Sequence, residues 1–323
     1  MAVDAVITWV DGNDPAHRAR LGAYLQSIGS APPAARAARF HDAGEIDWCV
    51  ASILRHAPWI GRIFIVADAQ TPPFLARIAG TPLGERIRIV DHREVFAGFE
   101  RFLPTFNSRA IISTLWRIPG LAERFVYFND DFSLLRPVRE QDFFRDDGKV
   151  VVRGQWMRQS HRLPGRRIVQ ALKRLRGTQP DRAGNHDAQE LSARLAGFAD
   201  RYYRMFHNPY PMRRSTLQAF FDERPALFES NLAHRLRSSA QFKAEVLAAH
   251  LEIARGDAVF DNALHTVQLK PRQQSPRRVR AKMAAADREA DAAFACVQSL
   301  ELADADLQAD IIGWLRRHVG EPV

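Results

Sequence analysis

The chain has 323 residues, of which 46% are hydrophobic, so it can bury a large core and is not a disordered polymer. Lys and Arg number 46 against 37 Asp and Glu, which gives a formal net charge of +9 and favours an anionic partner such as a phosphate group, a nucleic acid or a membrane surface. The two cysteines, Cys49 and Cys296, fit neither a disulfide framework nor a zinc motif, and we expect buried, reduced thiols.

Targeting and membrane-spanning signals are absent from the sequence pattern. No basic stretch precedes an apolar segment with a small-residue cleavage site, and no window approaches the roughly 18 apolar residues of a membrane span. We therefore expect a cytoplasmic protein.

The first half of the chain alternates strand-like and helix-like patterns. Runs rich in β-branched and aromatic residues predict strands, and helical spacing of apolar residues predicts helices in between. The predicted strands cover 2–10, 62–68, 86–91 and 125–128, and the predicted helices cover 45–56 and 109–117. This alternation predicts an α/β fold with a mostly parallel, Rossmann-like sheet and helices on both faces.

The pattern changes after Gly148. One short β-run at 150–153 is followed by Arg-rich helical sequence, which predicts a mostly helical C-terminal portion. We expect an α/β core at 1–155 and a mostly helical portion at 156–323. Two basic stretches, 161–182 and 270–282, carry much of the positive charge.

Acidic residues follow two of the predicted strands. Asn129, Asp130 and Asp131 come directly after the strand at 125–128, where adjacent carboxylates suit a hard divalent cation, although a capped turn explains them equally well. The segment 9–15 (WVDGNDP) follows the first strand and combines a Gly, which permits close backbone approach, with polar ligand groups; an Asx turn is the simpler explanation. Both clusters can converge on one crevice at the carboxyl ends of the strands.

Other candidate site residues lie before a helix or in loops. Asn107 or Ser108 is a predicted helix N-cap, where free N–H groups also suit a phosphate. His207, in FHNPYP, has the chemistry of a general base, and Arg235 and Arg237 have the chemistry of a phosphate clamp. Most loop histidines and helix arginines have no such role.

The basic stretches lack the aromatic residues of a nucleic-acid stacking platform, and no zinc-finger or helix-turn-helix spacing occurs. We expect no nucleic-acid partner. An anionic glycan, an anionic membrane surface or plain solvent fits these stretches equally well.

Several quoted segments together resemble one family. VDAVITWVDGNDP, HAPWIGRIFIVADAQTP, LPTFNSRAI and RIPGLAERFVYFNDD, with the later FHNPYP and RLRSS, are similar to the Stealth family of bacterial capsule and exopolysaccharide phosphotransferases. The catalytic subunit of the lysosomal-enzyme N-acetylglucosamine-1-phosphotransferase is similar to the same family. The resemblance is strongest over residues 1–138.

The resemblance implies a glycosyltransferase-A-like sheet at 1–155 that binds a nucleotide-sugar, with the portion 156–323 completing the active and acceptor sites. It implies transfer of a hexose-1-phosphate from a UDP-sugar to a glycan hydroxyl, with release of UMP, in capsule, exopolysaccharide or surface-glycan synthesis. An association with the inner face of the membrane and a homo-oligomer are compatible with it.

The same resemblance implies roles for individual residues. Asp130 and Asp131 would hold Mg²⁺ or Mn²⁺, and the catalytic residues would be His207, Arg237 and Asp130. The implied substrate-binding residues are Trp9, Asp11, Gly12, Asn13, Asn107, Ser108, Asn129, Arg235 and Gln298. The family's fourth block usually reads Cys-Leu-Asn-Asp, whereas this chain has Cys-Val-Gln-Ser at 296–299, which retains an amide at Gln298 but lacks the carboxylate.

Two other functions remain open from the sequence. A metal-dependent glycosyltransferase would use the same kind of sheet and acidic motif but would release UDP. A non-catalytic basic protein would bind polyanions in a strongly salt-dependent way. The acidic clusters oppose the second alternative, because they repel phosphate unless a cation intervenes.

Overall fold

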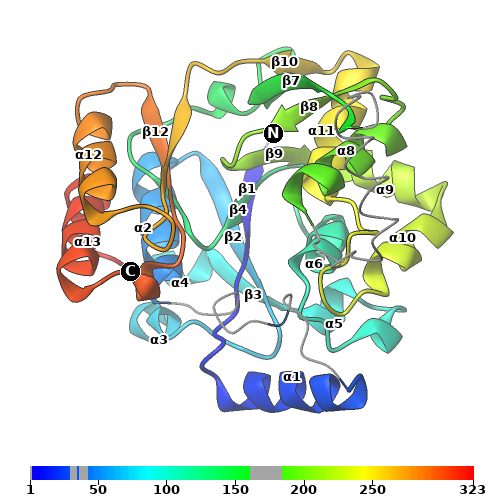
Figure 1. The fold of residues 1–323 in the computed structure, drawn as a ribbon, viewed down its shortest axis with the longest axis horizontal. Coiled ribbons are helices and arrows are strands. Elements are labelled where there is room, and N and C mark those ends of the chain that lie inside the picture. Colours follow the sequence, from blue (N-terminus) through cyan, green and yellow to red (C-terminus); the bar gives the residue numbers. More distant parts are fainter. Residues whose placement is uncertain (1, 30–34, 36–42, 161–183) are drawn as a thin grey trace, which may run out of the picture.

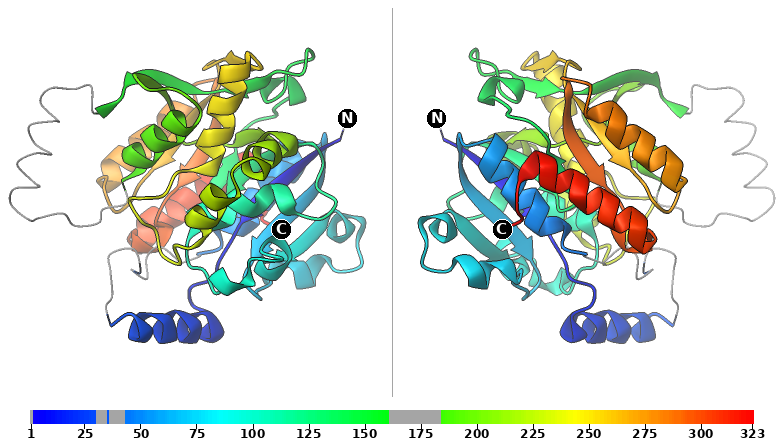
Figure 2. Two further views of the ribbon diagram at one scale, coloured as in Figure 1. Left: turned by 90° about the vertical axis from the view of Figure 1, so that its right-hand side faces the viewer. Right: turned by 90° about the vertical axis from the view of Figure 1, so that its left-hand side faces the viewer.

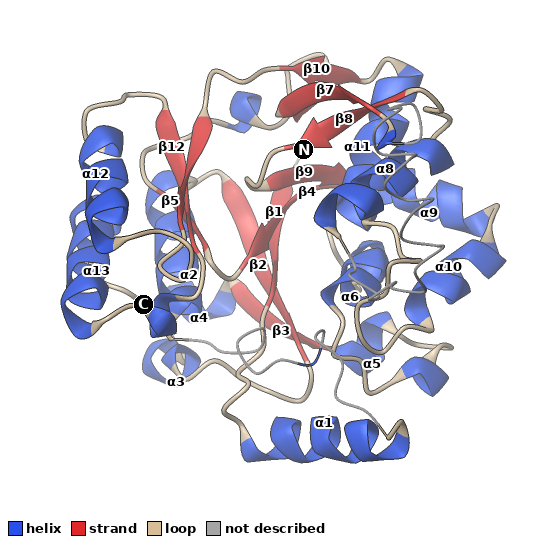
Figure 3. Ribbon diagram, viewed as in Figure 1, coloured by secondary structure: helices blue, strands red, loops and turns tan. Residues whose placement is uncertain are grey.

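The computed structural model describes residues 2–29, 35, 43–160 and 184–323. A five-stranded sheet in the order β3-β2-β1-β4-β9 lies at its centre, between groups of helices (Figure 3). The strands of this sheet are β1 (Val3–Thr8), β2 (Ile60–Ala67), β3 (Ile87–Asp91), β4 (Arg124–Asn129) and β9 (Tyr210–Arg213).

The central sheet is mostly parallel. β1 pairs in parallel with β2 on one side and β4 on the other, β2 pairs in parallel with β3, and only β9 runs antiparallel to its neighbour β4. The predicted α/β class with a mostly parallel sheet is therefore confirmed.

Apolar runs form the central strands because helices cover both faces of the sheet. Every side chain from Ile63 to Ala67 is fully buried, as are those of Phe125, Val126 and Phe128. Strands buried on both faces need continuous hydrophobic sequence and not an alternating pattern, which is what the sequence supplies.

Helices α2 (Glu45–His56) and α6 (Ser108–Thr114) lie on opposite sides of β1 and β2 (Figure 1). The predicted helix at 45–56 is confirmed, and its apolar positions Ile46, Cys49, Val50 and Ile53 are all fully buried. Asn107, one of the two residues that the sequence predicted as a helix N-cap, is the N-cap of α6. Its side chain accepts a hydrogen bond from the Arg109 amide. The predicted helix at 109–117 ends earlier, and a 3₁₀ turn completes it.

The other described helices surround this core. They are α1 (Pro15–Ser27), α3 (Phe74–Ile78), α4 (Pro82–Glu85), α5 (His92–Val95), α8 (Asn185–Leu195), α9 (Arg214–Asp222), α10 (Pro225–Leu232), α11 (Ala244–Arg255), α12 (Pro276–Ala286) and α13 (Ala305–Val319).

A second, three-stranded sheet has the order β11-β12-β5, with β5 (Phe132–Leu134), β11 (His265–Leu269) and β12 (Ala292–Val297). Helices α12 and α13 cover it, and α13 lies against α2 (Figure 2). Trp314 on α13 is fully buried in this second core, and its indole N–H donates to Asp287 at 2.7 Å.

Two short sheets complete the described strands. β6 (Val150–Val152) pairs with β10 (Ala258–Phe260), and β7 (Gly154–Arg158) pairs with β8 (Arg201–Met205). The C-terminal portion thus contains strands as well as the expected helices. A domain division at residue 155 stays a prediction. Two strand pairs join the parts of the chain before and after this position: β4 pairs with β9, and β5 pairs with β12.

The basic stretch 161–182 lies outside the described residues, whereas part of the stretch 270–282 forms α12. Among the helices that the structure describes, none has both the length and the apolar content of a membrane span.

Phe128 tests the account of the central sheet. It lies in β4 and is fully buried, so Phe128→Ala should lower the free energy of unfolding by about 3 to 5 kcal/mol through lost contacts and a residual cavity. Phe260→Ala is the matched control, because that side chain is 49% exposed in an edge strand and should cost much less. Urea unfolding measures both variants, and equal losses would contradict this packing.

Candidate active site

A pocket of about 970 Å³ opens where the parallel strands of the central sheet end. Thr8 ends β1 and Trp9 follows it, Asp68 follows β2, and Asn129 ends β4; all four residues line the pocket. The strands end together because Thr8 pairs with Val66 in β2 and with Asn129 in β4. Ligands of open α/β sheets bind at this edge.

The acidic segment Asn129–Asp131 forms the turn between β4 and β5 and lines the pocket. Its backbone is fixed from two directions: the Val297 amide donates to the Asp131 carbonyl at 2.9 Å, and the Cys49 thiol donates to the Asn129 carbonyl at 3.6 Å. The Tyr127 hydroxyl donates to the Asn129 side chain at 2.6 Å. The turn is thus held rigidly by groups outside it.

Asp131 combines burial with an incomplete set of hydrogen bonds. Its Oδ2 accepts a hydrogen bond from the Cys296 thiol at 3.4 Å, whereas its Oδ1 is buried without a partner among the described residues. Burial raises the pKa of Asp131 to about 6. A buried, incompletely paired carboxylate is unfavourable alone, and a bound cation would compensate it. Asp131 and Asp130 are therefore well suited to a hard divalent cation such as Mg²⁺ or Mn²⁺.

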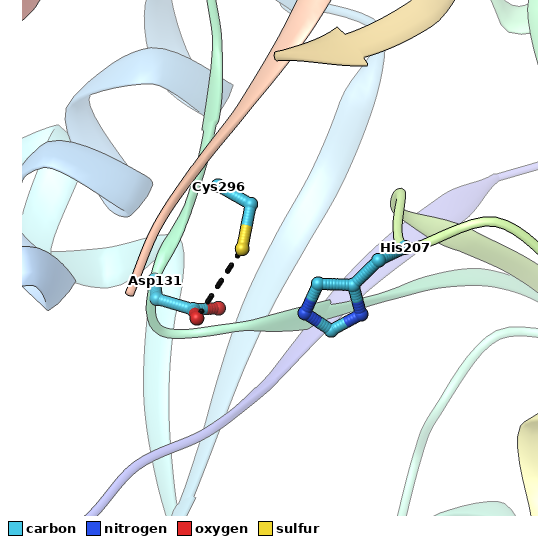
Figure 4. Close-up of side chains that lie close together, drawn as sticks. All are labelled: Asp131, His207 and Cys296. Atoms are coloured by element: carbon cyan, nitrogen blue, oxygen red, sulfur yellow. Dashed lines mark hydrogen bonds between the residues drawn. The ribbon is translucent and has the colours of Figure 1, made fainter. Parts of the chain in front are cut away.

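His207 lies in the loop between β8 and β9, beside the acidic turn (Figure 4). Its ring contacts Phe132 edge to face at 4.7 Å between centroids, and the Gln298 amide donates to His207 Nε2 at 3.3 Å. Burial is the main cause that lowers the pKa of His207 to about 3, and nearby cations add to it. The imidazole is therefore neutral near pH 7 and retains an acceptor nitrogen.

Three cations in the pocket, Arg237, Lys243 and Lys270, are close enough to lower the pKa of His207. Arg237 donates to the Ser108 hydroxyl at 2.7 Å. Lys243 pairs with the buried Glu245 at 2.8 Å. The gathering of three cations on one pocket wall suits an anion.

Lys243, Glu245 and Lys270 were not predicted as site residues. Their sequence contexts, FKAEV and LKPRQ, look like ordinary solvated charges. Only the fold, which brings α11 and the end of β11 to the same pocket, reveals them.

The end of the pocket near β1 to β3 also contains residues that the sequence did not indicate. Asp68 follows β2 and pairs with Arg20 at 3.1 Å, and His92 begins α5 after β3. Burial lowers the pKa of His92 to about 4, and its Nδ1 has no hydrogen-bond partner among the described residues. Trp9, predicted from sequence, lines the same end and is almost fully buried.

Eight of the sequence-predicted residues line the pocket together: Trp9, Ser108, Asn129, Asp130, Asp131, His207, Arg237 and Gln298. The other five, Asp11, Gly12, Asn13, Asn107 and Arg235, are not part of its lining. A binding role for these five stays a prediction, and each has a structural contact.

Asp11 accepts a hydrogen bond from the Asn13 amide at 2.7 Å, which is the Asx turn that the sequence left open. Arg18 holds the same loop by donating to the Gly12 carbonyl at 3.0 Å and to the Asn13 side chain at 2.6 Å. The loop is thus ordered by its own side chains.

Asn107 is fully buried, and its amide donates to the His234 carbonyl at 2.6 Å and to Gln241 at 2.8 Å. It therefore joins the start of α6 to the segment that contains Arg237. Arg235 donates to the Arg101 carbonyl at 3.2 Å and lies over the Tyr24 ring.

Two family models match the chain. Residues 1–29 match Stealth protein CR1, conserved region 1, and residues 39–152 match Stealth protein CR2, conserved region 2. The resemblance to the Stealth family stated from the sequence is therefore confirmed over these two conserved regions.

Curated relatives are named as phosphotransferases. Exopolysaccharide phosphotransferase SCO6023 of Streptomyces coelicolor is 35% identical over 73% of this chain and 37% of its own length. Receptor polysaccharide phosphotransferase WefC of Streptococcus oralis is 28% identical over 80% of each chain. Capsular polysaccharide phosphotransferase LcbA of Aeromonas hydrophila is 40% identical over 45% of this chain and 39% of its own length. The chain thus spans well under half the length of SCO6023 and LcbA.

Solved structures with some likeness include the galactosyltransferase LgtC in complex with donor and acceptor sugar analogues, with a TM-score of 0.45 and 12% identity over 98% of this chain and 97% of LgtC. Mouse xyloside xylosyltransferase 1 has a TM-score of 0.39 and 10% identity over 92% of this chain and 97% of its own. Scores of this size do not establish a shared fold, so the glycosyltransferase-A-like form of the sheet stays a prediction.

The environment of His207 has a direct spectroscopic consequence. Because its pKa is lowered to about 3, the imidazole should remain neutral in the folded chain between about pH 8 and 5, whereas histidines of the urea-unfolded chain should titrate near about pH 6.5. Proton NMR of the histidine rings measures this, with His207→Gln as the assignment control. A midpoint of about 6.5 for His207 would contradict its half-buried, cation-flanked position.

Proposed function

We propose that the chain transfers a hexose-1-phosphate from a UDP-sugar to a glycan hydroxyl, which forms a phosphodiester and releases UMP. The observation that carries this proposal is that one pocket is lined by two adjacent carboxylates, a neutral imidazole and several cations, three of which lie near that imidazole. Transfer at phosphorus needs neutralisation of the pyrophosphate, alignment of the acceptor hydroxyl and removal of its proton. The matches to two conserved regions of Stealth proteins and the phosphotransferase names of the relatives support the same reaction.

Asp130 and Asp131 are the proposed ligands of Mg²⁺ or Mn²⁺. Their oxygens, with the Oδ1 of Asp131 that has no partner among the described residues, fit a hard cation, which they would hold. Such an ion would supply neutralisation of phosphate charge. The tight hold on the turn by Val297 and Cys49 fixes these ligands before the donor binds.

Arg237, Lys243 and Lys270 are the proposed contacts of the donor phosphates. These three cations lie close enough to His207 to lower its pKa. Their positive charges would compensate the negative charge that forms on the phosphate of the leaving UMP as the phosphorus–oxygen bond breaks. Arg237 is oriented by Ser108, and Lys243 is oriented by Glu245. The ion pair and the hydrogen bond limit the movement of these side chains.

His207 is the proposed base that accepts the proton of the acceptor hydroxyl. In the unliganded pocket its pKa of about 3 keeps it neutral. A bound pyrophosphate would place negative charge beside it and raise that pKa toward the working range of a general base. The Gln298 contact holds the ring, so the amide at this position can serve although the family's carboxylate is missing at Ser299.

The nucleoside is proposed to lie at the end of the pocket formed by β1 to β3, near Trp9. Asn129 and Ser108 also line the pocket, and we propose that they contact the donor. We also propose a substrate-binding role for five residues that do not line the pocket and that would act through the loops they order. They are Asp11, Gly12, Asn13, Asn107 and Arg235. The proposed acceptor is a glycan of capsule, exopolysaccharide or another surface polymer, made on the cytoplasmic side of the membrane. The net charge of +9 suits an association with an anionic membrane surface there.

The first experiment tests whether the acidic turn is needed for turnover. Incubation with a panel of UDP-sugars, a glycan acceptor and Mg²⁺ should yield UMP, and EDTA should abolish it. Asp130→Asn and Asp131→Asn should each lose on the order of a hundredfold or more in kcat, because the amide cannot supply the charge that the cation needs. Asp222→Asn, which changes an exposed carboxylate on α9, is the matched control. Full activity in EDTA, or in both turn variants, would remove the cation from the mechanism.

Lys270 provides a separate test of the phosphate contacts. Lys270→Met keeps most of the side-chain volume but removes the charge, and it should lower kcat on the order of a hundredfold. Lys149→Met is the control, because Lys149 forms an exposed pair with Asp147 at 3.2 Å. Steady-state kinetics at saturating Mg²⁺ distinguishes the variants, and equal activity of the two would exclude a role for Lys270.

A further inference from the structure

Asp131, His207 and Cys296 come from three separate segments and meet on one wall of the pocket (Figure 4). Asp131 follows β4, His207 precedes β9, and Cys296 lies in β12. Each offers one ligand atom, and the three atoms all lie within 4.8 Å of one another. The sulfur of Cys296 and Oδ2 of Asp131 are 3.4 Å apart.

The three atoms are an oxygen, a nitrogen and a sulfur, and this mixture differs from the oxygen ligands that Mg²⁺ requires. Zn²⁺ binds carboxylate, imidazole and thiolate together, at about 2.0 to 2.3 Å, which places tetrahedral ligand atoms about 3.3 to 3.8 Å apart. The Cys296–Asp131 distance already matches this spacing. A movement of about 1 Å by the His207 ring would complete it.

Two further observations favour a ligand at this position. Oδ1 of Asp131 is buried without a partner among the described residues, so the carboxylate retains an unused acceptor. The His207 ring is oriented by Phe132, and the Asp131 backbone is held by Val297, so surrounding groups fix these two ligands; a metal ion at His207 Nε2 would replace the hydrogen bond from Gln298. Such supporting contacts are a common property of protein metal sites.

We propose that Asp131, His207 and Cys296 form a binding site for Zn²⁺ or a similar borderline-soft cation. The site is distinct from the oxygen site of the turn but shares Asp131 with it, so a bound zinc ion competes with the activating cation and inhibits the enzyme. Three protein ligands leave a fourth position for water.

The charges of this site balance. The Cys296 thiol loses its proton to the buffer when the metal binds, His207 binds as a neutral imidazole, and Asp131 binds as a carboxylate. Two anionic ligands then neutralise the two charges of the cation. Because the imidazole is already neutral in the free chain, it has no proton to lose.

The spacing of the cysteines in the sequence excludes a zinc motif, and the structure explains why a site can still form. The ligands are at positions 131, 207 and 296, so no short motif contains two of them. The antiparallel pairing of β12 with β5 places Cys296 opposite Phe132, next to Asp131.

Titration of the metal-free, full-length chain with Co²⁺ tests this site without donor or acceptor, so the result does not depend on the transferase reaction. Co²⁺ occupies zinc sites and gives a thiolate-to-metal charge-transfer band in the near ultraviolet. The wild-type chain should show the band with one equivalent of Co²⁺, and added Zn²⁺ should remove it. Mg²⁺, which competes through Asp131 alone, should weaken the band only at concentrations far above those of Zn²⁺.

Cys296→Ser should lose the charge-transfer band. Cys49→Ser should retain the band, because Cys49 contacts the Asn129 carbonyl and not Asp131. Cys49 is the other thiol of the chain and is equally buried, so this variant is the matched control. His207→Gln should weaken Co²⁺ binding by at least about tenfold, and it changes a loop residue, so it serves if the strand variant fails to fold. Absence of the band in the wild-type chain, its loss in Cys49→Ser alone, or unchanged Co²⁺ affinity in His207→Gln would overturn the proposal.

Discussion

The in-register parallel pairing of β1 with β2 and β4 is the constraint on which the site depends. Thr8 lies opposite Val66 on one side and Asn129 on the other, so the three strands end at the same level. Their following segments then enter one pocket. A slip of one residue in β4 would reverse its side chains across the sheet, burying polar groups and displacing Asp130 and Asp131.

Later parts of the chain complete what the parallel strands begin. β9 pairs antiparallel with β4 and brings His207 beside the acidic turn, and β12 pairs with β5 and brings Cys296 and Gln298 to the same place. The pocket therefore brings carboxylates, cations and a neutral imidazole together. This combination suits a pyrophosphate with a bound cation, and it opposes simple polyanion binding, because Asp131 would repel phosphate if no cation were bound.

Local sequence pattern was sufficient for the central strands, for α2 and for the Asn107 cap, because these follow from continuous apolar runs, helical spacing and a single side-chain hydrogen bond. It was insufficient where distant segments meet. Lys243, Lys270 and His92 have no local signal, since each becomes a pocket residue only through its place in the fold. Asn107 was predicted both as a helix cap and as a substrate-binding residue. It caps α6, but its amide binds the 234–241 segment and does not line the pocket. β11 and β12 were missed because the sequence after Gly148 was interpreted as helical.

The central claim is that the bond to phosphorus, and not the bond to the anomeric carbon, breaks. A UDP-sugar labelled in the phosphate next to the sugar distinguishes the two, with phosphorus NMR of the glycan product as the readout. The account predicts that the label enters the product as a sugar-1-phosphate diester and that unlabelled UMP is released. Label retained in released UDP, with no diester in the product, would contradict it and would indicate a glycosyltransferase.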